Sequence, residues 1–108
     1  MISEPFDVLA VPFPFMDGPG RKRRPAVVLS HRDFNGEGHT VLCLITTKGH
    51  SPWPGDTEIK DFKAAGLHLP CLARLKVFTL DNRVLIKKIG RFSPDDARRF
   101  SHAFSLSL

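Results

Sequence analysis

Short apolar segments separated by turn residues dominate the first ninety positions of the chain. Runs of four to eight residues rich in β-branched and aromatic side chains, bounded by Gly, Pro, Asn or Asp, are typical of β-strands. The run 41–46 is continuously apolar up to its last residue, as in a strand buried on both faces. We expect strands at residues 6–13, 25–30, 41–46, 57–59, 71–75 and 84–89.

Helical features are concentrated at the end of the chain. Residues 61–65 are expected to form only a helical turn, closed by Gly66. Ser93 is a favourable N-cap and Pro94 a favourable first helical residue, and the apolar positions after them recur on one helical face. The pattern predicts a mainly β fold, a small and mostly antiparallel β barrel with a C-terminal α-helix packed on it.

Length and composition narrow the class of protein. The chain has 108 residues, 42% of them hydrophobic, which predicts a single domain spanning residues 1–108. Its longest apolar runs fall short of the ~18 residues that cross a bilayer, so no membrane association is expected. Sixteen Lys and Arg against eleven Asp and Glu give a net charge of +5, which favours an anionic partner.

The two cysteines, Cys43 and Cys71, both lie inside apolar runs. This placement predicts buried thiols rather than a disulfide framework, and a reducing, cytoplasmic location. The five histidines and two cysteines show no metal-ligand spacing, and no Gly-rich phosphate-binding motif is present. We therefore expect neither a metal nor a cofactor.

Four adjacent cations, residues 21–24, stand immediately before Pro25 at the start of a predicted strand. A solvated basic loop is the simplest interpretation of such a run. Pro25, however, restricts Arg24 to an extended conformation, so that one guanidinium is held at the strand start while its neighbours stay on the loop. Thr46 and Thr47 end the next long strand, where a hydroxyl is well placed to bind a phosphate oxygen.

The order of several motifs along the chain resembles the PemK/MazF family of type II toxins. The most specific parts are Arg24-Pro25 after a Gly-rich loop and the threonine that ends the next long strand. The stretches 73–75, 78–81 and 89–93, which read Ala-Arg-Leu, Phe-Thr-Leu-Asp and Ile-Gly-Arg-Phe-Ser, add to the resemblance. It covers nearly the whole chain.

The resemblance implies an SH3-like barrel that forms a homodimer and cleaves single-stranded RNA at short sequence motifs without a metal. It implies a small antitoxin partner that blocks the RNA groove, and contact with DNA only through the antitoxin complex. The family's catalytic arginine and threonine correspond to Arg24 and Thr46. The usual Gly-Asp opening is Phe6-Asp7 here, and a further catalytic arginine corresponds to Arg74, whereas the place of its acidic partner holds Lys76.

Metal-free RNA cleavage uses the 2′-hydroxyl of the substrate as nucleophile. Arg24 suits stabilisation of the charged transition state, because its planar fork can bind two phosphate oxygens. Arginine is a poor base, since deprotonation near pH 7 costs roughly 9 kcal/mol. His31 and His50 are the candidates for proton transfer.

Other side chains are expected to hold the RNA through phosphate contacts or base stacking. Two alternatives to the nuclease remain open. One is a non-catalytic basic barrel that binds nucleic acid. The other is a gyrase-poisoning toxin on the same fold, although the C-terminal Trp-Gly-Ile of that relative is missing here. The candidate RNA-binding residues are Arg21, Lys22, Arg23, Thr47, Trp53, Arg74 and Lys76.

Overall fold

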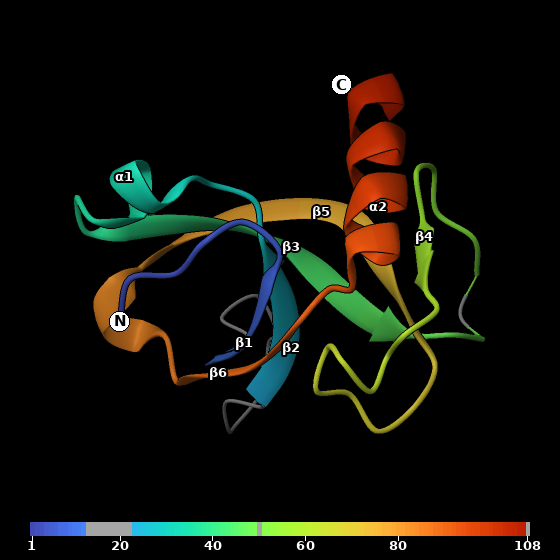
Figure 1. Cartoon of the computed structure of the whole chain (residues 1–108), viewed down its shortest axis with the longest axis horizontal. Helices are drawn as coiled ribbons and strands as arrows, with labels where there is room; N and C mark the ends of the chain where they lie inside the picture. The colour runs from blue at the N-terminus through green and yellow to red at the C-terminus, as the bar shows by residue number, and fades with distance from the viewer. Residues whose placement is uncertain (13–22, 50, 108) are drawn as a thin grey trace.

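A computed structural model describes residues 1–12, 23–49 and 51–107. Six strands form one curled sheet in the order β4-β5-β3-β2-β1-β6, and every recorded pair is antiparallel. The helix α2 stands on one face of this sheet beside β4 (Figure 1). The elements are β1 (Asp7–Pro12), β2 (Arg23–Val28), α1 (Arg32–Asn35), β3 (His39–Thr47), β4 (Thr57–Ile59), β5 (Cys71–Asp81), the 3-10 helix η1 (Asn82–Val84), β6 (Lys87–Arg91) and α2 (Pro94–Ser107).

The predicted fold class, a mainly β curled sheet with a C-terminal helix, is confirmed, and each predicted strand overlaps an observed one. Several boundaries differ by one or two residues, and two differ by more. β5 continues to Asp81, because its second half is a partly exposed strand in which polar positions interrupt the apolar run. The last strand starts at Lys87 rather than Val84, because the Asp81 carboxylate accepts the backbone N–H of Arg83 and turns residues 82–84 into η1.

A short helix differs from the sequence pattern, because the turn predicted at Asn35-Gly36 is preceded by α1. Asn35 is fully buried and holds this region together: its amide donates to the Ser3 and Ser30 carbonyls, at 2.7 and 3.0 Å. These buried hydrogen bonds stabilise the connection between β2 and β3, whose conformation is not evident from the local sequence. The helical turn predicted at residues 61–65 is confirmed: the Ala65 N–H donates to the Asp61 carbonyl at 3.4 Å, and Gly66 follows with a φ of +78°.

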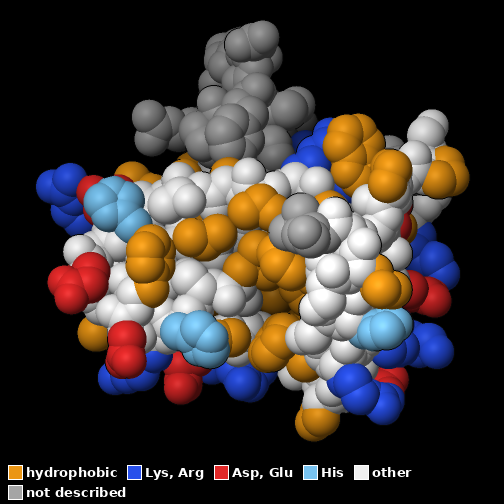
Figure 2. Space-filling view, turned by 90° about the horizontal axis from the view of Figure 1, so that it is seen from above, with side chains coloured by type: hydrophobic (Ala, Val, Ile, Leu, Met, Phe, Trp, Pro, Cys, Tyr) orange, Lys and Arg blue, Asp and Glu red, His pale blue; other side chains and the backbone are white. Residues whose placement is uncertain are grey.

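The hydrophobic core has two parts, one on each face of the sheet. The part under α2 includes Phe92 and Phe100, whose rings meet edge to face at 5.8 Å. The part on the other face is smaller and centres on Leu9 and Leu42. Alternating side chains of β1, β2 and β3 feed both parts, which explains their nearly continuous apolar sequences. Viewed from above, hydrophobic side chains gather near the middle of the exposed face, while Lys and Arg lie mainly around its rim (Figure 2).

The start of α2 confirms the predicted cap. The Ser93 hydroxyl accepts the backbone N–H of Asp96 at 3.1 Å, and Pro94 is the first helical residue. Asp96, in the first turn of α2, is 1% exposed. Its carboxylate accepts the backbone N–H groups of Lys60 and Asp61, at 3.0 and 2.9 Å, and so ties α2 to the chain after β4. Among the helices that the structure describes, none is long and apolar enough to span a membrane.

Two glycines bring the 61–66 turns into backbone contact with β6. Gly66 has a φ of +78°, and a Cβ there would overlap the Ile89 carbonyl. A Cβ on Gly90 would in turn overlap the backbone of Ala65 and Gly66. The Arg91 N–H donates to the Ala64 carbonyl at 3.0 Å, which fixes the same contact. Both positions therefore require glycine.

Replacing Gly90 with alanine should lower the free energy of unfolding by about 1–3 kcal/mol, because the added methyl must displace backbone rather than a flexible side chain. Urea denaturation followed by circular dichroism measures this loss. Gly36→Ala is the matched control, since a Cβ there meets only ordinary contacts at 3.5 and 3.6 Å. Equal stabilities for the two variants would contradict the close approach described above.

Candidate functional site

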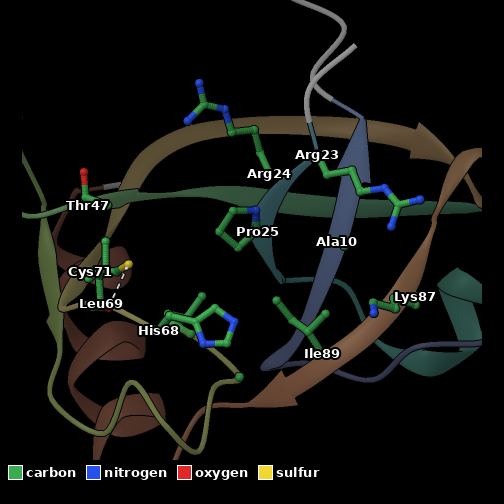
Figure 3. A pocket seen from close by; sticks show the side chains of 12 residues that line it. Ala10, Arg23, Arg24, Pro25, Thr47, His68, Leu69, Cys71, Lys87 and Ile89 are labelled. Carbon is green, nitrogen blue, oxygen red and sulfur yellow. Dashed lines mark hydrogen bonds between the residues drawn. The ribbon is translucent and has the colours of Figure 1, made fainter.

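A hollow of about 390 Å³ opens where the beginning of β2 and the end of β3 separate. The two strands are paired only at residues 26–28 of β2, and the preceding residue, Pro25, has no N–H to continue the ladder. Residues 23–25 of β2 are paired with β1 on their other side. The hollow is lined by residues 23–25 of β2, by the end of β3, by β6 and by the 66–69 loop (Figure 3).

The hollow combines an apolar floor with a cationic rim. Arg23 and Arg24 on β2 and Lys87 on β6 line it, and all three are exposed. The 66–69 loop adds the imidazole of His68, which lies on the side of the hollow away from Arg24 (Figure 3). Such a cavity suits an anionic group on the rim with a flat apolar group against the floor. The floor is formed by Ala10, Pro25, Leu67, Leu69, Cys71 and Ile89.

One of the two predicted hydroxyls lines the hollow. Thr47 is exposed and belongs to its wall, whereas the half-buried Thr46 does not. Side chains alternate along β3, so Thr47 shares the face of Ile45 and the α2-side core, and Thr46 takes the opposite face. By the same alternation Arg24 starts from the face of Thr46, and its side chain points away from His68 at the rim of the hollow (Figure 3). Arg24 and Thr47 therefore line the same hollow, although their side chains leave the sheet from opposite faces.

Arg74, expected to contact RNA phosphates, is bound by a carboxylate of its own chain. Its guanidinium donates to both oxygens of Asp56, at 3.1 and 3.0 Å, and to the Ser51 carbonyl at 2.7 Å. The side chains of the pair are only 11% and 17% exposed. The carboxylate that pairs with Arg74 therefore comes from Asp56, in the chain before β4. Arg74 holds the 51–56 loop against β5.

Trp53 and Lys76 form a second contact between this loop and β5. The Lys76 ammonium lies 4.5 Å from the centre of the Trp53 ring, and the indole N–H donates to the Leu75 carbonyl at 3.3 Å. Trp53 remains 42% exposed. Neither residue is among those that line the hollow. An exposed ring held in place from two sides is compatible with base stacking, and the stacking itself stays a prediction.

His31 lies at the far end of β2 from Arg24, after the last strand residue, Val28. The five positions from Arg24 to Val28 alone span roughly 13 Å of strand, and His31 lies beyond them. His31 is exposed at the start of α1 and does not line the hollow, so proton transfer to a phosphate at Arg24 does not follow from its position. The predicted residues Arg21, Lys22 and His50 lie outside the described residues.

Two residues of the hollow, His68 and Lys87, were missed by the sequence analysis. Both come from segments that are distant in sequence from Arg24, and neither belongs to a recognisable motif. The sequence offered only an indirect indication of His68, because Gly66 was predicted to close a turn. The contact of Gly66 with Gly90 places His68 beside β6, and this contact is a feature of tertiary packing that the sequence pattern does not show.

Both cysteines are buried free thiols, as predicted. Burial raises the pKa of the Cys43 thiol to about 12, and burial also raises the pKa of Cys71, which lines the hollow. A thiol with a raised pKa is a weak nucleophile and a poor base near pH 7. Within the described ranges, no three His, Cys, Asp or Glu side chains gather into a potential metal site.

Comparison with protein families gives one match that covers almost the whole chain. The PemK-like, MazF-like toxins of type II toxin–antitoxin systems match residues 4–108. The chain belongs to this toxin family. The resemblance drawn from the Arg24-Pro25 motif and the strand order is thereby confirmed. Curated proteins include no match.

Solved structures with the same fold include other toxins. A MazF from Deinococcus radiodurans is 19% identical and has a TM-score of 0.74, with 100% of this chain and 99% of that chain covered. A mycobacterial endoribonuclease in complex with its cognate antitoxin is 14% identical, with a TM-score of 0.75 and coverage of 98% and 92%. The Mycobacterium tuberculosis toxin MazF-mt6 is 14% identical, with a TM-score of 0.74 and coverage of 94% for both chains. At these identities the likeness establishes the fold of this toxin.

Proposed function

We propose that this toxin is a sequence-specific endoribonuclease that cleaves single-stranded RNA without a metal, through attack of the 2′-hydroxyl on the adjacent phosphorus. The observation that carries the proposal is the hollow, where Arg24 and Thr47 of a PemK/MazF-type chain line one cavity with Arg23 and Lys87. A phosphodiester meets positive charge and a hydroxyl there, and the apolar floor suits a neighbouring ribose or base.

Arg24 stabilises the transition state in this mechanism. Extra negative charge develops on the two non-bridging oxygens as the 2′-oxygen attacks, and a guanidinium can bond to both. Thr47 adds a donor through its hydroxyl. Arg23 and Lys87 hold the flanking phosphates, while Trp53 stacks on a base further along the strand.

We also propose the assembly expected for such a toxin: a cytoplasmic homodimer, inhibited by a small antitoxin and contacting DNA only through that complex. The sheet ends in two edge strands, β4 and β6, which a protein partner can cover. The mycobacterial relative was solved with its cognate antitoxin, and a Deinococcus radiodurans structure holds MazE with MazF. Sedimentation of the purified toxin tests the dimer, since a species of only 12.1 kDa at micromolar concentration contradicts it.

Cleavage of a defined single-stranded RNA by the purified toxin in EDTA tests the proposed function. Fragments that end in a 2′,3′-cyclic phosphate and begin with a 5′-hydroxyl are expected, because the 2′-oxygen is the nucleophile. A substrate with a single 2′-deoxynucleotide at the cleaved position should resist cleavage there. Activity that stops on chelation overturns the metal-free mechanism, and binding of RNA without cleavage supports the non-catalytic alternative.

Affinity for RNA should depend on salt through the cations on the rim. Lys87→Ala should reduce the slope of log affinity against log salt concentration by about 0.7, the value for one phosphate contact to a single strand. Fluorescence anisotropy with a labelled, 2′-deoxy-blocked RNA measures it. Lys60→Ala is the control, since Lys60 is exposed and does not line the hollow. An unchanged slope for Lys87→Ala places that residue off the RNA.

A further inference from the structure

We propose that His68 is the general base of this toxin, the group that accepts the proton of the attacking 2′-hydroxyl. The inference rests on the proposed function and adds a catalytic residue to it. His68 lies in the 66–69 loop and lines the hollow together with Arg24. Figure 3 shows it on the other side of the hollow from the arginine.

The first argument is an inventory of the protons in the hollow. Arg23, Arg24 and Lys87 are cations, which already carry their protons and have no lone pair to accept another. The Cys71 thiol keeps its proton, because burial raises its pKa. Among the described residues that line the hollow there is no carboxylate. Imidazole is the side chain that exchanges a proton between pH 5 and 8.

The second argument is the position of the imidazole. In the proposed complex, a phosphate bound by Arg24 and Thr47 would lie at the wall drawn uppermost in Figure 3, and its ribose would occupy the hollow that His68 also lines. Proton abstraction needs an acceptor within hydrogen-bonding reach of the 2′-oxygen, directly or through one water molecule. His68 would approach the ribose from the wall that lies across the hollow from Arg24 (Figure 3).

The third argument is that the loop is held rigidly while the imidazole stays accessible. Gly66 is locked against Ile89 and Gly90, and the next residue, Leu67, is 8% exposed with its N–H donating to the Phe62 carbonyl at 2.9 Å. His68 itself is exposed. A catalytic base needs this combination of a fixed backbone and an open side chain.

The step balances without another reactant. The 2′-O–H bond breaks and its proton passes to the imidazole, while the oxygen electron pair forms a bond to phosphorus. The bond from phosphorus to the 5′-oxygen breaks, and that oxygen takes a proton from solvent in the open hollow. The products are a 2′,3′-cyclic phosphate and a 5′-hydroxyl. The imidazolium then returns its proton to water.

The test compares His68→Gln with His102→Gln on a cleavable RNA. His102 is an exposed histidine on α2 that does not line the hollow, and its variant should match the parent toxin. His68→Gln should lower the single-turnover rate constant about 10²-fold, with RNA affinity and melting temperature unchanged. Between pH 5 and 8 the rate constant of the parent should rise with pH as the base loses its proton, and this rise should be absent in His68→Gln. A rate constant equal to the parent's overturns the proposal.

Two further measurements separate a base from an acid or a structural residue. On RNA with a 5′-bridging sulfur, a thiolate leaves without a proton, so the defect of His68→Gln should persist if His68 is the base and vanish if it is the acid. Free imidazole should restore part of the activity of His68→Gly, and absence of rescue contradicts direct proton transfer. If the parent toxin cleaves no RNA, the proposed function fails, whereas a cleaving parent with an equally active His68→Gln refutes only the role of His68.

Discussion

Substitution of Arg24 by lysine should lower the rate constant of RNA cleavage about 10²–10³-fold, nearly as far as substitution by alanine. Lysine keeps the charge but loses the planar fork, and the loss of one preorganised donor to a developing oxyanion typically costs that much. Single-turnover cleavage of a defined RNA measures the rate constant, and binding of a 2′-deoxy-blocked RNA measures affinity. Arg24→Lys should retain most of the affinity, because the positive charge remains.

Arg98→Lys is the matched control for this experiment. Arg98 is an exposed arginine on α2 that pairs with Asp95 and does not line the hollow. Its replacement should leave both cleavage and binding at the parent values. Parent-rate cleavage by Arg24→Lys would show that charge alone suffices, and the two-bond role of Arg24 would then be wrong.

Removal of the Thr47 hydroxyl should cost about 10²-fold in the cleavage rate constant, again with RNA binding retained. Thr47→Ser should keep much of the activity, because the hydroxyl is the part that donates to the phosphate. Thr46→Ala should lower the rate constant less than tenfold, because Thr46 does not line the hollow. The same single-turnover assay measures all three variants.

The pair of threonine variants decides between two assignments. The family resemblance places the catalytic hydroxyl at Thr46, which lies on the same face of the sheet as the start of the Arg24 side chain. The hollow contains Thr47 instead. A larger loss for Thr46→Ala than for Thr47→Ala would support the family correspondence and would place the reacting phosphate on the other face of the sheet.

The sequence was most informative where local chemistry decides the structure. The N-cap at Ser93, the buried cysteines and the extended strand that Arg24 and Pro25 enter all depend on residue type and near neighbours. These features, with the order of the strands, were enough to predict the fold and one wall of the hollow.

Features that depend on long-range packing were not predictable in this way. The ion pair of Arg74 with Asp56 joins β5 to the loop before β4, and its charges neutralise each other in a largely buried place. If residues such as Arg74 are counted from the sequence as free cations, the positive surface available to RNA is overestimated. His68 illustrates the opposite error, because an isolated loop histidine acquires a possible role only through the contact that brings its loop to the hollow.

The contact between Gly66 and Gly90 has a consequence for substrate recognition. Because no side chain separates the two backbones, the segments that carry His68 and Lys87 are in direct contact and together form one wall of the hollow. If this wall binds RNA as proposed, the conformational entropy of ordering it is lost during folding rather than during binding, so little of the interaction energy with RNA is spent on arranging it. Preorganisation of this kind makes the wall a fixed template, and a nucleotide that does not match its shape cannot induce a better fit.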